Sequence, residues 1–390
     1  MPSAIFPEEI IVEILLRLPV RSLLQFRCVC KFWKNLISDP QFAKSHVLSS
    51  TAYPQLVSID IGIAKSDIVS YPLKPLLENP NPSAGVKSAF FLSRQRTSMI
   101  GSCNGLICFF NSLRSTFKLR NPAMKLKSKT SPKIFTCFDR MKILYSGFGY
   151  DQVNDRYRVL AVVESCRISE GVKTIIYTFG EKNWTTVQNF PSRRDPNLWW
   201  CGKFVSGTLN WIVNKGRRRN STNRSVIVSF DLEKETYAEI LLPQHDCENF
   251  CNPVLYVSSN NCICVSFDHP MKTHWVVWIM KEYGVVESWT KLMIIPQDML
   301  ISDFRNRCMS DALFITEHEV LLLRPNQYKL VVYKLNNNSG LDYRSEILGK
   351  FAHRLHIYHE SLVSPQWLKR SQKRNKRKMK QELGSAKHYL

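Results

Sequence analysis

The N-terminal part of the chain has apolar side chains at helical spacing. Isoleucine and leucine recur every three or four residues from Ile10 to Leu18, while Glu13 and Arg17 lie on the opposite face. Proline fits the first position of a helix and disfavours helical geometry in the residue before it. The pattern therefore predicts three short helices, over 7–18, 22–26 and 29–37, with stops at Pro19 and at Asp39-Pro40.

These helices carry more large apolar side chains than about 40 residues can bury on their own. Two interpretations follow from that excess. In the first, the helices form a cap whose apolar face packs against the rest of the chain. In the second, part of this face is a docking surface for another protein, with anchors spaced along the helices. The pattern alone does not decide between them.

From about Tyr53 onward, helical spacing gives way to short alternating runs separated by turn residues. The runs are rich in β-branched and aromatic residues and are bounded by Gly, Pro, Asn and Asp. No long amphipathic helix is predicted between them, which argues against βαβ units and a parallel sheet. Ten strands are predicted, over 56–61, 105–110, 157–163, 173–179, 208–213, 225–232, 262–267, 274–280, 319–324 and 329–335.

The predicted strands repeat at regular intervals. Five apolar positions, separated by 53, 50, 54 and 57 residues, are expected to lie in the first strand of each unit: Leu106, Val159, Leu209, Ile263 and Val320. A period of about 50 residues with about four strands per unit is typical of β-propeller blades of the kelch kind. We therefore expect a mainly β fold of about six blades after the small helical segment. A strand near Leu56 is expected to close the ring with the last blade.

The helical segment closely resembles the F-box. The matching positions are Phe6-Pro7, Ile14-Leu15, Leu18-Pro19, Ser22-Leu23-Leu24, Phe26-Arg27-Cys28-Val29-Cys30-Lys31, Trp33 and Leu36-Ile37. The family usually opens with leucine-proline, whereas this chain has Phe6-Pro7; phenylalanine is also apolar, so we expect docking to be kept. The resemblance implies binding to the Skp-type adaptor of a cullin-based ubiquitin ligase. The residues implied to form or support that interface are Pro7, Ile10, Ile14, Leu18, Pro19, Leu24, Val29, Cys30 and Trp33.

The β body resembles the F-box-associated domain of plant F-box proteins, a group often described as F-box/kelch-repeat proteins. The resemblance rests on segments at 101–110, 119–125, 148–160, 202–213, 227–243, 278–292 and 358–365. It implies that the body binds a target protein through loops at one face, and it does not fix which residues do so. We expect an F-box over residues 1–46, an F-box-associated, kelch-like β-propeller over 53–365 and a basic tail over 366–390.

Together the two resemblances imply a substrate-recognition subunit of a Skp–cullin–F-box (SCF) ubiquitin ligase. Such a subunit promotes ubiquitination and proteasomal degradation by position alone, because it holds the target near a ubiquitin-loaded enzyme. No phosphate-binding, dinucleotide-binding, zinc-protease or nucleophile-elbow motif is found, so we expect neither enzymatic activity nor a cofactor. Two alternatives stay open: an adaptor-binding scaffold that directs no degradation, and a basic propeller that binds nucleic acid. An enzyme of the galactose-oxidase-like propeller type would need a metal site, which the sequence does not show.

The chain is strongly basic, with a net charge of +22. Residues 366–390 hold nine basic residues against one acidic residue and contribute +8, while Arg217-Arg218-Arg219 forms a second, local run. A basic block of this kind is typical of a nuclear-import signal, and the alternative is a solvated chain end. We expect the protein in the nucleus, the cytoplasm or both, without direct binding to nucleic acid. The candidate signal comprises Lys369, Arg370, Lys373, Arg374, Lys376, Arg377, Lys378 and Lys380.

The remaining chemistry-bearing residues are expected to be structural. The N-terminus lacks the pattern of a signal peptide and no run reaches about 18 apolar residues, so we expect reduced cysteines and no membrane helix. The nearest approaches to a metal site are His245 with Cys247 and Cys251, and His353 with His356 and His359, and neither is expected to bind metal. Six aromatic residues are expected to pack between blades: Trp184, Trp211, Tyr237, Trp275, Trp278 and Trp289. Asp151, Asp231 and Glu287 are expected in turns or at blade edges.

Overall fold

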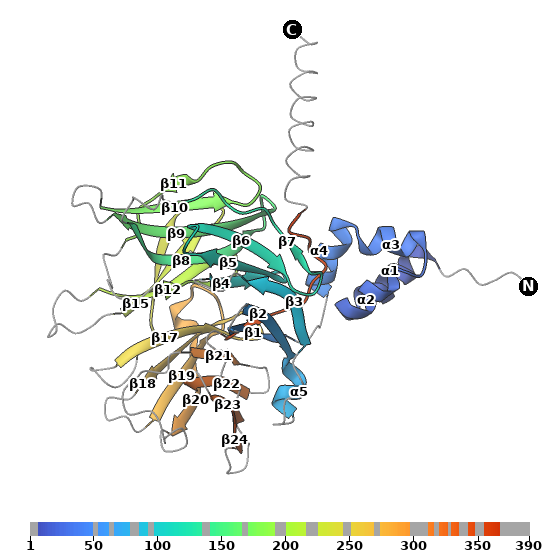
Figure 1. Ribbon diagram of the computed structural model, residues 1–390. Coiled ribbons are helices and arrows are strands. Elements are labelled where there is room, and N and C mark those ends of the chain that lie inside the picture. Colours follow the sequence, from blue (N-terminus) through green and yellow to red (C-terminus); the bar gives the residue numbers. More distant parts are fainter. Residues whose placement is uncertain are drawn as a thin grey trace, which may run out of the picture.

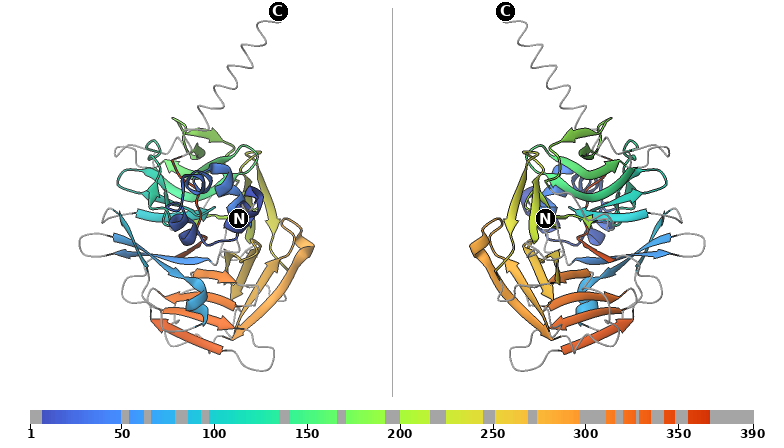
Figure 2. Two further views of the ribbon diagram at one scale, coloured as in Figure 1. Left: turned by 90° about the vertical axis from the view of Figure 1, so that its right-hand side faces the viewer. Right: turned by 90° about the vertical axis from the view of Figure 1, so that its left-hand side faces the viewer.

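The computed structural model describes residues 7–49, 54–61, 66–78, 86–92, 97–134, 141–165, 171–191, 200–215, 225–244, 251–268, 274–296, 311–315, 320–326, 329–334, 342–347 and 355–366. Within these residues the chain forms an N-terminal group of helices followed by a mostly β body (Figure 1). Figure 2 shows the sheets radiating around a central axis, with the helices lying over one face. The expected fold, a helical segment joined to a β-propeller, is confirmed.

The N-terminal helices are α1 (Glu8–Leu16), α2 (Val20–Phe26), α3 (Lys31–Ile37) and α4 (Pro40–Ser49). The first three confirm the prediction, although Pro7 and Pro19 lie one position before α1 and α2 as N-cap residues. The fourth helix was not predicted. Asp39 caps it, because its Oδ1 accepts hydrogen bonds from the N–H groups of Gln41 (2.8 Å) and Phe42 (3.1 Å). The Asp39-Pro40 pair therefore ends α3 and also starts α4.

The described strands form six sheets, numbered here as blades in chain order. Blade 1 contains β1 (Gln55–Ile61), β2 (Ser66–Pro72), β3 (Val86–Leu92) and the C-terminal β25 (Leu355–Tyr358), with α5 (Leu73–Glu78) after β2. Blade 2 contains β4 (Thr97–Cys103), β5 (Leu106–Asn111), β6 (Thr116–Asn121) and β7 (Leu126–Lys127). Blade 3 contains β8 (Met141–Asp151), β9 (Arg156–Ser165), β10 (Val172–Thr178), β11 (Thr185–Val187) and β12 (Trp200–Cys201).

The other three blades follow the same plan of four antiparallel strands. Blade 4 contains β13 (Lys203–Val205), β14 (Thr208–Asn214), β15 (Ser225–Asp231) and β16 (Tyr237–Leu241). Blade 5 contains β17 (Cys251–Val257), β18 (Ile263–Asp268), β19 (His274–Met280) and β20 (Trp289–Pro296), with the short 3-10 helix η1 (Val286–Ser288) before β20. Blade 6 contains β21 (Asp311–Ile315), β22 (Val320–Asn326), β23 (Lys329–Lys334) and β24 (Asp342–Ile347).

All ten predicted strands are present, at β1, β5, β9, β10, β14, β15, β18, β19, β22 and β23. The five recurring apolar positions do occupy equivalent places in successive blades, but the assignment to the first strand was wrong. They lie in β5, β9, β14, β18 and β22, each the second strand of its sheet. First strands give a weaker pattern; β13, for example, spans three residues and has no alternation to detect.

The ring closes as expected between the N-terminal and C-terminal parts of the body. β1 pairs antiparallel with β25, and Leu56 lies opposite Ile357. The second strand of blade 1 therefore comes from the start of the body and its first strand from the end. This pairing joins the two ends of the body in one sheet.

The core lies between blades. In β9, seven consecutive residues from Tyr157 to Val163 are buried, because both faces of this strand pack against neighbouring sheets. The packing role expected for the aromatic residues is confirmed: Trp211, for example, is buried and meets the ring of Phe190 edge-on at 5.7 Å. The indole N–H of Trp211 donates to the carbonyl of Ser146 at 3.0 Å, which satisfies its polar atom.

Asp151 and Glu287 lie near strand ends, as expected, and Asp151 also holds a turn. Asp151 accepts a hydrogen bond from the N–H of Asn154 at 3.0 Å, and Glu287 is exposed in η1. Asp151 also lies 3.7 Å from the guanidinium of Arg158, which bonds a second carboxylate, that of Glu235 in blade 4. This buried arginine therefore links blades 3 and 4.

Candidate functional site

One side of the helical group is fixed to the propeller. Its buried side chains belong to the same apolar cluster as side chains of blades 2 and 3 and of the segment after β25. The helical members are Leu15, Val20, Leu23, Ile37, Phe42 and Ala43, and the members after β25 are Leu362 and Val363. The cap interpretation is therefore correct for this side of the helices.

Polar contacts reinforce the same junction. Lys44 of α4 pairs with Asp155 of blade 3 at 2.5 Å, and Arg21 of α2 pairs with Glu360 at 3.6 Å. Burial raises the pKa of Glu360, and the charge of Arg21 acts in the opposite direction. The amide of Asn121 in β6 donates to two carbonyls of the segment after β25, each at 2.8 Å. The helices are thus held in one orientation on the propeller.

The other side of the helices leaves several large apolar side chains exposed. Ile10 and Ile14 of α1 are 46% and 52% exposed, whereas Leu15 of the same helix is buried. Val29, just before α3, is 62% exposed, and Phe32 of α3 is 41% exposed. Exposed apolar side chains that form a contiguous patch mark interaction sites. The cap interpretation therefore holds for one side of the helices, and docking stays a prediction for the exposed side.

The nine sequence-predicted residues fall into two groups. Six of them are exposed, namely Pro7, Ile10, Ile14, Pro19, Val29 and Cys30. The other three, Leu18, Leu24 and Trp33, are half-buried and pack against the apolar cluster that the helices share with the propeller. The structure therefore separates residues available for contact from residues that support them.

Two features of this surface were missed in the sequence. Phe32 was not assigned a docking role, although its three-residue spacing from Val29 was a usable signal for a shared helical face. Cys30 has a local structural role, because its Sγ accepts a hydrogen bond from the N–H of Trp33 at 3.4 Å and so caps α3.

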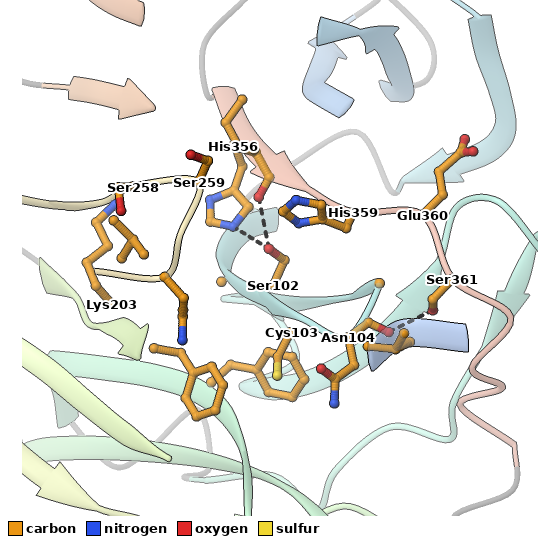
Figure 3. A pocket seen from close by; sticks show the side chains of 18 of the residues that line it. Ser102, Cys103, Asn104, Lys203, Ser258, Ser259, His356, His359, Glu360 and Ser361 are labelled. Carbon is orange, nitrogen blue, oxygen red and sulfur yellow. Dashed lines mark hydrogen bonds between the residues drawn. The ribbon is translucent and has the colours of Figure 1, made fainter. Parts of the chain in front are cut away.

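A central cavity of about 450 Å³ opens beneath the helices (Figure 3). Inner strands of several blades line it, and Val47 of α4 lies at its rim. His356 approaches Ser102, with 3.0 Å between Nε2 and Oγ. Burial lowers the pKa of His356 to about 3, helped by the charge of Lys203, and burial also lowers the pKa of His359. Both imidazoles are therefore neutral near pH 7.

The serine fixes the tautomer of His356. Ser102 Oγ donates its proton to the carbonyl of Ile357 at 2.9 Å, so it accepts the bond from His356, and Nε2 carries the imidazole proton. Figure 3 shows His356, His359 and Ser102 together in the cavity. Among the described residues, no group of three His, Cys, Asp or Glu side chains is placed to hold a metal ion.

Several sequence-predicted features lie outside the described residues. These are the candidate import signal at 369–380, the arginine run at 217–219, His245, Cys247 and His353. The seven cysteines whose side chains are described form no disulfide. In the described part of the chain, no helix has both the length and the apolar character needed to cross a membrane.

Residues 56–365 match the family of the F-box associated beta propeller domain, and residues 5–45 match the F-box domain. The chain belongs to the F-box-associated β-propeller family. The two matched regions coincide with the propeller and with the helical group that rests on it.

Curated relatives are F-box proteins of Arabidopsis thaliana. The F-box/kelch-repeat protein At3g23880 is 31% identical over 79% of this chain and 84% of its own length. F-box protein CPR1 is 24% identical over 86% of this chain and 83% of its own length. F-box protein At3g07870 is 30% identical over 73% of this chain and 71% of its own length. Of these three relatives, the first carries the kelch designation in its name.

The family membership supports substrate recognition for SCF ubiquitin ligases as the general role of this F-box protein. Within that role, the F-box implies contact with a Skp-type adaptor and the β-propeller implies a bound target. F-box proteins related to this chain are typically non-catalytic adaptors.

Proposed function

We propose that this F-box protein is the substrate-recognition subunit of an SCF ubiquitin ligase that directs a bound target protein to ubiquitination and proteasomal degradation. In this proposal the helical group binds a Skp-type adaptor and, through it, a cullin. The propeller holds the target. We assign the F-box to residues 1–46, the propeller to 53–365 and a basic tail with nuclear-import function to 366–390.

The observation that carries the proposal is the division of the helical group into two sides. Burial of a half-exposed isoleucine, valine or phenylalanine contributes about 1 kcal/mol. Ile10, Ile14, Val29 and Phe32 together therefore offer about 4 kcal/mol to a partner, before the cost of association. Leu18, Leu24 and Trp33 act indirectly, because they hold the helices that present these side chains.

The proposed mechanism is positional. The buried cluster and two ion pairs fix the helices on the propeller. An adaptor bound to the exposed side and a target bound to the propeller are then held at a defined separation. That arrangement raises the effective concentration of target lysines at the ubiquitin-loaded enzyme without chemistry in this chain.

The proposal is tested by affinity purification of the tagged full-length chain from plant cells, followed by quantification of bound adaptor and cullin. Wild type is compared with Ile10→Asp/Ile14→Asp, which places charge on the exposed side without disturbing the buried cluster. The matched control is Leu113→Asp, since Leu113 in blade 2 is 57% exposed and so resembles Ile14.

We expect adaptor and cullin to be recovered with wild type and with Leu113→Asp, and to be lost from the double variant. Proteasome inhibition should then enrich ubiquitinated proteins in the wild-type sample. Recovery of adaptor without cullin or ubiquitinated proteins would instead support a scaffold that directs no degradation. Equal recovery from all three chains would contradict the assigned docking surface.

A further inference from the structure

Blade 2 and the segment that follows it carry many basic residues, which are separated from one another in the sequence. Residues 111–134 contain seven basic residues and no acidic one. We call these seven the blade-2 basic surface: Arg114, Lys118, Arg120, Lys125, Lys127, Lys129 and Lys133. Arg114 and the four lysines from Lys125 to Lys133 are exposed, while Lys118 and Arg120 are half-buried.

Strand register brings three of these side chains together. Lys118 lies opposite Phe109, Arg120 lies opposite Ile107, and Lys127 lies opposite Arg120. Paired residues share a face of the sheet, and on this face Phe109 and Ile107 belong to the apolar cluster with blade 1. The face is therefore apolar near the axis and basic towards the outer strands β6 and β7.

This arrangement is unfavourable for the isolated chain. Like charges directly opposite each other on neighbouring strands destabilise a sheet, as Arg120 and Lys127 do here. Burial lowers the pKa of Lys118, and the charges of Lys127, Arg120 and Arg114 lower it further. Apart from Arg120, these basic residues take part in none of the ion pairs found among the described residues. For the six basic residues other than Arg120, no ion pair among the described residues offsets the repulsion, which is typical of a functional site.

The backbone beneath these charges is held firmly. Ser128 and Ser131 follow β7 and run beside β6, where their Oγ atoms accept hydrogen bonds from the N–H groups of Leu119 (2.9 Å) and Phe117 (2.8 Å). The indole of Trp184 in blade 3 donates to the carbonyl of Pro132 at 3.1 Å. The backbone that carries these lysines is therefore fixed before a partner binds, which reduces the conformational entropy lost on binding.

We propose that the blade-2 basic surface binds an acidic segment of the target protein. The proposal rests on the substrate-recognition role proposed above and adds the chemistry by which a target is selected. Carboxylates of the target would supply opposite charges for the six residues other than Arg120, which form no ion pair among the described residues. Binding to single-stranded nucleic acid is less favoured, because Phe32 in α3 is the sole aromatic among the exposed large apolar residues described, and blade 2 offers none for base stacking.

The test uses the purified full-length chain and a fluorescently labelled oligo-glutamate peptide, with binding followed by fluorescence anisotropy at several salt concentrations. The surface variant is Lys125→Gln/Lys127→Gln/Lys129→Gln/Lys133→Gln. The control, Lys142→Gln/Lys182→Gln/Lys234→Gln/Lys281→Gln, removes the same net charge from exposed lysines in blades 3, 4 and 5. Thermal unfolding of both variants checks that they remain folded.

We expect the surface variant to bind the peptide about 10- to 50-fold more weakly than wild type, and the control to change affinity less than about threefold. Added salt should weaken wild-type binding. Equal weakening in both variants would show a mere net-charge effect and overturn the proposal. Tighter binding of a labelled oligonucleotide of equal charge would overturn it as well.

A parallel adaptor pull-down separates this proposal from the docking role. The surface variant should retain the adaptor, because its substitutions lie on the propeller. Loss of the adaptor from this variant would overturn the inference by placing the basic surface in the adaptor interface. Failure of wild type to bind the adaptor, with peptide binding intact, would instead count against the SCF role alone.

Discussion

Gly105 occupies the turn between β4 and β5, where replacement by alanine should weaken the support beneath the helices. Its φ is +74°, and an added Cβ would lie 2.2 Å from Ser361 Oγ and 2.9 Å from the carbonyl oxygen of His359. The left-handed conformation costs an L residue about 1–2 kcal/mol. Ser361 would also have to move, and it would release its hydrogen bonds to the carbonyl of Asn104 (2.7 Å) and the N–H of Val363 (3.2 Å).

Each lost hydrogen bond costs about 1 kcal/mol, so Gly105→Ala should lower the free energy of unfolding by about 3–4 kcal/mol. Gly207 provides a matched control, because it occupies the corresponding turn of blade 4, between β13 and β14. Its φ is +80°, and nothing lies within 4 Å of an added Cβ. Gly207→Ala should therefore cost about 1–2 kcal/mol, from the backbone conformation alone.

Denaturant unfolding of the two full-length variants, followed by tryptophan fluorescence, measures the difference. We expect Gly105→Ala to be less stable than Gly207→Ala by about 2 kcal/mol. Limited proteolysis should also show faster cleavage between the helices and the propeller in Gly105→Ala, since Val363 belongs to their shared cluster. Equal stability of the two variants would refute the idea that Ser361 and Gly105 are held in close contact.

Three further predictions concern the blades, the cavity and the tail. Arg158→Met should lower the free energy of unfolding, measured with denaturant, by about 3 kcal/mol, because it leaves the buried carboxylate of Asp151 without its charge partner. Arg156→Met removes a partly exposed ion pair and should lower it by less than about 1 kcal/mol. Similar losses in the two variants would contradict the role of Arg158 in linking the blades. The pKa of His356 falls from 6.5 in the unfolded chain to about 3 in the folded chain. Between pH 6.5 and pH 3 the unfolded chain therefore binds more protons than the folded chain, so the free energy of unfolding should fall as the pH is lowered through this range. His356→Gln should show a shallower fall between pH 7 and pH 5, and parallel curves would contradict the assignment. Glutamine at the eight basic residues of 369–380 should lower the nuclear fraction of a fluorescent fusion, and an unchanged distribution would reject the import signal.

Much of the fold was predictable because its strands carry their own pattern. A strand such as β9, buried on both faces, has a continuous apolar run, and the roughly 50-residue period shows where the pattern recurs. Short strands such as β13 contain too few residues to alternate, so the position of the repeated residues within a blade was misassigned. The helix α4 was missed because an aspartate–proline pair signals an end and a start equally well.

The two sides of the helical group could not be separated from the sequence. Ile14 and Leu15 are neighbours of similar hydrophobicity, yet one is exposed and the other buried, because α4 packs against one side of α1. Periodicity identifies an apolar helix but not what covers each part of it. The blade-2 basic surface was hidden for a similar reason, since Arg120 and Lys127 come together through the turn between β6 and β7.

The dissociation constant of the purified full-length chain for a plant Skp-type adaptor, measured by calorimetry, tests the central claim most directly. We expect a measurable complex with wild type, affinity at least about 30-fold weaker for Ile14→Asp, and affinity within about twofold of wild type for Leu113→Asp. Absence of binding by folded wild type, or equal loss in both variants, would contradict the assignment of the exposed helical side to adaptor docking.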